Sequence, residues 1–345
     1  MIKEAIAKAS AGAALEMDEA SAAMEEIVRG EATPAQIAAF AVALRMKGET
    51  PREIAGLARV MRQEAVRVKV SGDVVDTCGT GGDGRSTFNI STVAAFVASG
   101  AGVRVAKHGN RAYTSACGSA DVLEALGVAI DLQPEEVVRC VDEVGIGFMF
   151  APMYHPAMKH AAGPRREIGI RTVFNILGPL TNPAGASTQL LGVASADLTP
   201  IMGEVLGLLG CRRALVVHGE DGLDEVSLSG RTSICEVYDG HSRRYELEPE
   251  ELGLRRSPLG ALVGGSAAEN AAIAESVLKG ERGPRRDVVL LNAGAALYAS
   301  GQVESLREGV SRAADSIDSG AAAAKLEQLR SLSQSLRERR TSLVS

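Results

Sequence analysis

The sequence predicts an α/β protein with a small N-terminal helical domain, residues 1–70, and a larger domain, residues 71–345, that has a mostly parallel central sheet flanked by helices. Two observations lead to this prediction. The first 70 residues carry apolar side chains at helical spacing. From Val74 onwards, short apolar runs alternate with helical stretches, which is typical of a parallel sheet with helices on both faces. We also expect part of 155–190 to join the helical domain.

Four helices are expected in the N-terminal domain, and the first two cover 2–9 and 17–28. Two more begin at 33–34 and 50–51, because a threonine N-cap followed by proline at the first helical position is a strong helix start. This segment contains no histidine and no group of residues typical of catalysis. We therefore expect its role to be structural.

The larger domain is expected to hold six strands, an additional strand pair and several helices. The six strands are 74–77, 103–107, 146–150, 190–194, 214–218 and 288–292. The strand pair is 233–238 and 243–247, joined by a polar turn. The main helices are 120–126, 199–209, 267–278 and 321–340. Ligands of such sheets bind beyond the carboxyl ends of the strands.

Composition narrows the class of protein. The net charge is −6, from 37 basic and 43 acidic residues, which argues against nucleic acid as a bulk partner. No apolar run approaches the roughly 20 residues of a membrane span, and the N-terminus does not resemble a signal peptide. The five cysteines are far apart and form no CxxC pair, so reduced thiols in the cytoplasm are expected. Cys78 and Cys117 follow the pattern of small buried residues more than that of reactive thiols.

The most informative segment is 79–92, which lies between a predicted strand and a predicted helix. It holds four glycines and a group of hydroxyl side chains. Glycine lets the backbone approach a ligand, and a glycine loop before a helix directs several N–H groups at one anion, such as a phosphate. The alternative is a tight strand–helix connection with no ligand. The loop matches neither GxxxxGK[ST] nor GxGxxG, so the usual nucleotide-binding interpretations are not favoured.

A second segment, 107–121, repeats this design after the next strand. Lys107 supplies a positive charge, Ser115 and Ser119 supply donors, and Asn110 can both donate and accept. The alternative is a polar loop in which Ser119 is a helix N-cap. His108 alone is a poor candidate for a general base.

The adjacent carboxylates Asp224 and Glu225 are a third candidate. Mg²⁺ prefers a few carboxylates together with phosphate oxygens and water. Taken alone, such a pair is more often an ordinary solvated turn.

Four blocks in this order resemble the anthranilate phosphoribosyltransferase family. They are 79–83 with 89–92; 107–110 with 118–124; 155–159 with Arg165 and 169–183; and 219–225. The resemblance covers nearly the whole chain. The sequence departs from the common family pattern at 112–114 and 116–117 (Ala112, Tyr113, Thr114, Ala116 and Cys117), which leaves side-chain contacts there open.

The resemblance implies a reaction of tryptophan biosynthesis. The amine of anthranilate attacks C1 of 5-phosphoribosyl-1-diphosphate (PRPP), and diphosphate leaves. Such a reaction needs charge stabilisation at the leaving group and positioning of the amine. Because the neutral aniline nitrogen is already nucleophilic, no general base and no catalytic residue of that kind is expected.

The resemblance also implies which residues bind each ligand. The PRPP positions are Gly79, Gly82, Asp83, Thr87, Asn89, Ile90, Ser91, Thr92, Lys107, Ser115 and Ser119. The anthranilate positions are Gly79, Asn110 and Arg165, of which the arginine can pair with the substrate carboxylate. The Mg²⁺ positions are Ser91, Asp224 and Glu225. A homodimer through the N-terminal helices is implied as well.

Two alternatives remain at this point. A pyrimidine nucleoside phosphorylase would share the fold type and a similar glycine-rich loop, but the complete 107–110 segment with Arg165 and the acidic pair argues against it. A non-catalytic relative that binds nucleic acid would be expected to gain basic patches, whereas this chain is acidic.

Overall fold

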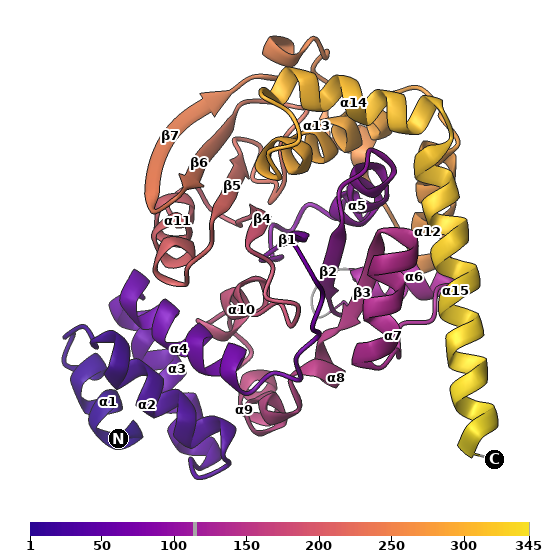
Figure 1. Ribbon diagram of the computed structural model, residues 1–345. Coiled ribbons are helices and arrows are strands. Elements are labelled where there is room, and N and C mark those ends of the chain that lie inside the picture. Colours follow the sequence, from indigo (N-terminus) through magenta and orange to yellow (C-terminus); the bar gives the residue numbers. More distant parts are fainter. Residues whose placement is uncertain (113–115, 345) are drawn as a thin grey trace.

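The computed structural model describes residues 1–112 and 116–344 and has the predicted architecture (Figure 1). The N-terminal domain consists of α1 (Ile2–Ser10), α2 (Met17–Val28), α3 (Pro34–Lys47) and α4 (Pro51–Gln63). The two predicted threonine caps are confirmed, since Thr33 accepts a hydrogen bond from the Gln36 N–H and Thr50 accepts one from the Glu53 N–H.

Seven strands form one sheet in the order β3-β2-β1-β4-β5-β6-β7. They are β1 (Val75–Gly79), β2 (Val105–Gly109), β3 (Ile146–Phe150), β4 (Thr188–Gly192), β5 (Arg213–Gly219), β6 (Thr232–Tyr238) and β7 (His241–Leu247). The first five run parallel, and β6 and β7 add an antiparallel edge. The strand order reverses between β1 and β4, so the switch point, where ligands of such sheets bind, lies at the carboxyl end of β1.

Each face of the sheet is covered by its own group of helices (Figure 1). On one face, α5 (Ile90–Gly100) and α13 (Pro284–Ala299) pack directly on the strands and on each other. On the other face, α11 (Leu198–Leu208) packs on β5 and β6. Adjacent residues of β4 show the alternation, because Leu190 belongs to the first core and Leu191 to the second. The remaining helices of the larger domain are α6 (Ser119–Ala125), α7 (Pro134–Arg139), α8 (Ala151–Tyr154), α9 (Lys159–Ile168), α10 (Phe174–Leu177), α12 (Ala267–Leu278), α14 (Leu306–Asp318) and α15 (Ala321–Val344).

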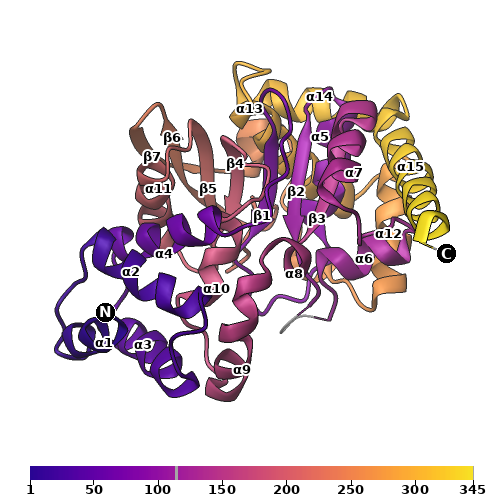
Figure 2. The same ribbon diagram turned by 60° about the horizontal axis from the view of Figure 1, so that its bottom comes forward.

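The segment between β3 and β4 lies against the N-terminal helices. Helix α9 packs on α2 and α3, and α10 packs on α4 (Figure 2). The core of the helical domain is continuous with the apolar layer between α11 and the sheet. Arg62 of α4 strengthens this junction, because its guanidinium donates to the Leu180 carbonyl at 2.6 Å and to the Leu209 carbonyl at 3.0 Å.

One predicted strand is wrong. Residues 288–292 lie inside helix α13, where both Val288 and Asn292 are fully buried. An apolar run of this length is compatible with a buried strand or with a helix that is enclosed on all sides, and periodicity cannot separate the two. Pro284 at the first turn and the alanine-rich continuation favour the helix.

The buried carboxylate of Glu53 holds the helical domain together. Its oxygens accept from the Leu15 N–H at 2.8 Å and the Thr50 N–H at 2.7 Å, and they pair with Lys47 at 2.9 Å. Glu53→Ala would leave a buried ammonium without its partner, so we expect a loss of about 3–5 kcal/mol in the free energy of unfolding. Urea denaturation measures this, with Glu25→Ala as the exposed control, for which a loss below about 1 kcal/mol is expected. Equal losses in both variants would contradict this role for Glu53.

Candidate active site

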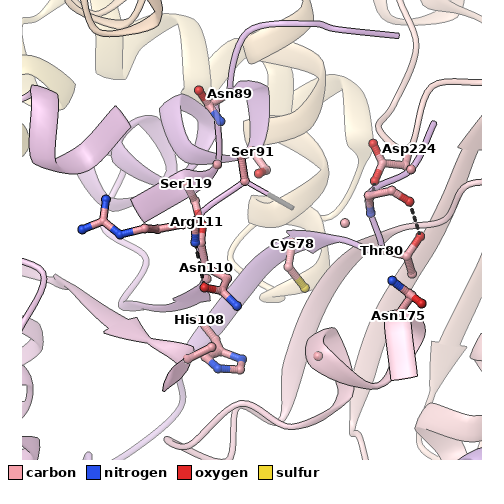
Figure 3. Close-up of a pocket in the computed structure, with 18 of the residues that line it drawn as sticks. Cys78, Thr80, Asn89, Ser91, His108, Asn110, Arg111, Ser119, Asn175 and Asp224 are labelled. Carbon is pink, nitrogen blue, oxygen red and sulfur yellow. Dashed lines mark hydrogen bonds between the residues drawn. The ribbon is translucent and has the colours of Figure 1, made fainter. Parts of the chain in front are cut away.

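The carboxyl ends of β1 and β2 open into a pocket of about 670 Å³. Strand β1 leads into the glycine loop and then into α5, and β2 leads into the loop that carries Asn110 and Arg111. Figure 3 shows Thr80 and Asp224 on one side of this pocket and Asn110 with Arg111 on the other, with Cys78 between them. The site therefore lies at the switch point of the sheet.

The loop after β5 crosses directly over the ends of β1 and β4. A side chain at Gly79 would clash with the Asp224 carboxylate, and one at Gly192 would clash with the Asp224 backbone. The Asp224 carboxylate accepts a hydrogen bond of 2.8 Å from the Gly81 N–H. The adjacent Glu225 accepts one of 3.1 Å from the Ser91 N–H in the first turn of α5. Glycine is needed at these strand ends because the acidic loop lies against them.

The acidic pair is held in an environment that disfavours negative charge. Burial and the nearby Asp83 carboxylate raise the pKa of Asp224 to about 7. Burial and the charge of Asp224 raise the pKa of Glu225 well above its ordinary value, although Lys107 opposes this. A cation bound here would relieve this repulsion.

Lys107 lies beneath the pocket and is 3% exposed. Its ammonium donates to the Thr77 carbonyl and, at 3.3 Å, to the Ser91 hydroxyl. Burial lowers the pKa of Lys107, while the carboxylates of Asp76 and Glu225 counteract this effect. The Nζ atom of the lysine thus lies between the first two strands, next to the first turn of α5.

The loop after β2 is held by a network of polar contacts. The Asn110 carbonyl accepts from the Ser119 hydroxyl at 3.3 Å, and the Asn110 side chain accepts from the Arg111 N–H at 2.8 Å. Asn89 donates to the Cys117 carbonyl at 3.1 Å, which ties this loop to the glycine loop. The backbone N–H of Ala112 donates to Asp121 at 2.9 Å. This contact does not depend on the side chain at position 112, where the sequence departs from the common family pattern.

The structure brings the candidate residues that it describes into one pocket. Lining it are Gly79, Gly82, Asp83, Thr87, Asn89, Ile90, Ser91, Thr92, Lys107, Asn110, Ser119, Arg165, Asp224 and Glu225. Ser115 lies outside the described residues, as do Tyr113 and Thr114.

Several lining residues were not singled out from the sequence as ligand-binding. The rings of His108 and His155 are in tilted contact, with 5.1 Å between their centroids and 55° between their planes, and the Nε2 atom of each is buried with no partner among the described residues. Burial lowers the pKa of His108 to about 3 and that of His155 to about 4, so both imidazoles are neutral near pH 7. Arg171 also lines the pocket. In the sequence, the only indication that Arg171 lies in the site was its position in the block 169–183, which resembles the family.

The five cysteines are free and buried. Burial raises the pKa of the Cys78 thiol well above its ordinary value and also raises that of Cys117. Both are therefore protonated near neutral pH, as expected of small buried side chains rather than nucleophiles.

The oxygen donors at the acidic pair fit Mg²⁺. Asp224, Glu225 and the Ser91 hydroxyl are hard oxygen ligands, and two buried carboxylates that repel each other favour a divalent cation. No set of three or more His, Cys, Asp and Glu side chains that could hold a metal occurs in 1–112 and 116–344. Nor does any helix in the described part of the chain have the length and apolar character needed to span a membrane.

The two domains of this fold are those of a glycosyltransferase family. Residues 3–65 match the family model described as "Glycosyl transferase family, helical bundle domain", and residues 71–323 match the one described as "Glycosyl transferase family, a/b domain". The chain is 60% identical over 330 residues to the anthranilate phosphoribosyltransferase of Moorella thermoacetica, covering 95% of this chain and 97% of the relative. The chain belongs to the anthranilate phosphoribosyltransferase family, whose reaction is a step of tryptophan biosynthesis.

Solved structures agree with this membership. The anthranilate phosphoribosyltransferase of Thermus thermophilus superposes with a TM-score of 0.91 at 49% identity and covers 96% of this chain and 99% of its own. The enzyme of Saccharomyces cerevisiae, solved in complex with PRPP and Mg, gives a TM-score of 0.85 at 31% identity. The match covers 93% of this chain and 94% of the yeast chain. These relatives fit the phosphoribosyltransferase interpretation and not the nucleoside phosphorylase or nucleic-acid-binding alternative.

The buried His155 gives the stability a defined pH dependence. Its folded pKa of about 4 lies below the unfolded value of about 6.5, so the unfolded chain binds protons more tightly and stability is lost as pH falls from 6.5 towards 4. We expect His155→Gln to shrink the difference in unfolding free energy between pH 7 and pH 5 by about 1–2 kcal/mol. Urea denaturation at the two pH values tests this. The exposed His241 serves as the control, and an unchanged difference in His155→Gln would refute the prediction.

Proposed function

We propose that this chain transfers the phosphoribosyl group from PRPP to the amine of anthranilate, with diphosphate as the leaving group. The observation that carries the proposal is the convergence of an anion-binding glycine loop, the buried Lys107 and the buried acidic pair on one pocket that Arg165 also lines. The names of the relatives support the same substrates.

The leaving-group end of the proposed site is built on the glycine loop. The backbone of Gly79 and Gly82, together with Asp83, would hold the diphosphate, with further contacts from 87–92. Lys107 and Ser119 would bind the phosphoribosyl part, as would Ser115. Ser91, Asp224 and Glu225 would hold Mg²⁺, which when bound neutralises charge on the diphosphate oxygens.

The acceptor end would be formed by Asn110 and Arg165, with Gly79 beside them. Arg165 lies on α9 with its guanidinium 5.9 Å from the centre of the Phe174 ring, and a cation in this position can pair with the carboxylate of anthranilate. We assign no general base. The nitrogen lone pair forms the new bond to C1 while the C1–O electrons pass to the diphosphate, and one amine proton is then lost to solvent.

The protein's role is therefore positioning and charge stabilisation. Charge develops on the departing diphosphate, where fixed N–H groups and cations are most effective because they need not reorganise. The amine must approach C1 in line with the departing diphosphate, which the pocket would achieve by holding the acceptor and the diphosphate at opposite ends with the sugar between them.

We further propose the division of the chain into a helical domain, 1–70 with part of 155–190, and an α/β domain, 71–345. A cytoplasmic location is supported by the free thiols. We also propose a homodimer through the N-terminal helices, which is what the resemblance to the family implies.

Anthranilate fluoresces, so transfer can be followed directly. We expect fluorescence to fall when the protein, PRPP and Mg²⁺ are mixed with anthranilate, and to stay constant when PRPP is omitted. Arg165→Ala should raise the KM for anthranilate by about tenfold or more, because a charge-assisted contact contributes about 1.5–3 kcal/mol. Its KM for PRPP should change little. Constant fluorescence with the folded wild-type protein would refute the proposed function.

The acidic pair can be tested separately from the acceptor end. Asp224→Asn combined with Glu225→Gln removes both proposed carboxylate ligands while keeping the size of the side chains. We expect the Mg²⁺ concentration for half-maximal activity to rise by at least tenfold, since few protein ligands would remain. The KM for anthranilate at saturating Mg²⁺ is the internal control. An unchanged Mg²⁺ dependence would show that the metal is held elsewhere.

A further inference from the structure

Arg171 is a cation of the pocket to which the resemblance assigns no ligand. It follows α9, which ends at Gly169 in the left-handed conformation, with φ of +68°. The next turn is fixed by a hydrogen bond of 2.9 Å from the Thr172 N–H to the Asn175 side chain. The backbone of Arg171 is thus held in place on both sides, so its side chain enters the pocket from a defined point.

The guanidinium of Arg171 lies directly on the glycine loop. One of its nitrogens donates to the Thr80 carbonyl at 3.0 Å. A side chain at Gly82 would overlap the guanidinium, and Gly82 has φ of +79°, a conformation that only glycine adopts without strain. Arg171 is therefore complementary in shape to the loop that is proposed to hold the diphosphate.

The charge of Arg171 is only partly satisfied in this position. The carboxylates of Asp224 and Asp83 act on it through space, yet no ion pair within 4.0 Å joins it to an acidic group among the described residues. A guanidinium has five N–H donors, and in 1–112 and 116–344 this one makes a single hydrogen bond. Arg171 lines the pocket and is half-buried, so most of its donors remain available to an anion on the loop.

Arg171 and the glycine loop belong to different parts of the fold. Arg171 lies between α9 and α10, which pack on α2, α3 and α4. The glycine loop, in contrast, belongs to the sheet through β1 and α5. The guanidinium of Arg171 therefore extends from the segment that packs on the N-terminal helices to the glycine loop at the end of β1.

We propose that Arg171 binds the diphosphate leaving group and is a further catalytic residue of the reaction. The inference rests on the proposed function, since it assigns the anion on the glycine loop as diphosphate. As the C1–O bond breaks, its electrons pass to the diphosphate oxygen, and a guanidinium that donates to this group stabilises the added charge. A purely structural role, in which the arginine only fixes the Thr80 carbonyl, would not require a positive charge at this position.

The test uses Arg171→Gln and Arg171→Lys in the full chain. For Arg171→Gln we expect kcat to fall by about 10²-fold, the loss typical of a donor to a developing charge. The Kd of inorganic diphosphate with Mg²⁺, measured by calorimetry, should rise by about tenfold, while the KM for anthranilate stays within twofold. Arg171→Lys should recover part of kcat, because it restores the charge without the planar fork.

The control is Arg29→Gln, which removes an arginine that is 58% exposed on the helical domain and should change neither value. Wild-type affinity for diphosphate in Arg171→Gln would overturn the inference, and so would a loss of kcat explained by a matching fall in melting temperature. If the wild-type protein binds diphosphate but transfers nothing to anthranilate, the proposed function fails. In that case weaker diphosphate binding in Arg171→Gln would still support Arg171 as a diphosphate ligand.

Discussion

The arrangement of the site depends on two carboxylates held against the ends of β1 and β4. Asp224 and Glu225 can lie there only because Gly79 and Gly192 leave no side chain in the way. Burying such a pair is costly, and the structure offsets this cost with the N–H groups of Gly81 and Ser91 and with the buried Lys107. The fully buried Asn292 of α13 accepts from the Val226 N–H at 2.9 Å and donates to the Val226 carbonyl at 3.0 Å. These two bonds fix the backbone directly after the acidic pair.

The helical domain completes the pocket from the opposite side. Its core continues beneath the sheet to α11, and Arg62 caps carbonyls of the larger domain, so the two parts are joined by apolar packing and by specific hydrogen bonds. Helix α9 and the turn after it carry Arg165 and Arg171, which place cations facing the acidic and anion-binding parts of the sheet. Cations therefore reach the pocket from both parts of the fold, Lys107 from the sheet and Arg165 and Arg171 from the segment beside the N-terminal helices.

Short sequence patterns predicted most of the helices and strands, because the residues that start or end these elements act over a few neighbouring positions. The threonine–proline starts at 33–34 and 50–51 act within one helical turn, and β1 to β5 are short segments that end at glycine or polar turns. The run 288–292 was assigned wrongly because burial on every side removes the periodicity that distinguishes a helix from a strand. The pairing order, with β4 next to β1, and the antiparallel edge cannot be read from any single segment.

The sequence alone determined the chemical groups of the site: a glycine loop before a helix, a lysine at a strand end, an arginine shortly after the block 155–159 and an adjacent acidic pair. These choices are local, since each depends on the backbone conformation or donor type that a few neighbouring residues provide. Only the tertiary structure decided that the Gly81 N–H donates to Asp224, that the rings of His108 and His155 are in contact and that the Arg171 guanidinium lies against Gly82. Such contacts join residues far apart in the chain, and their formation depends on strand order and helix packing, which follow from the free energy of the whole fold.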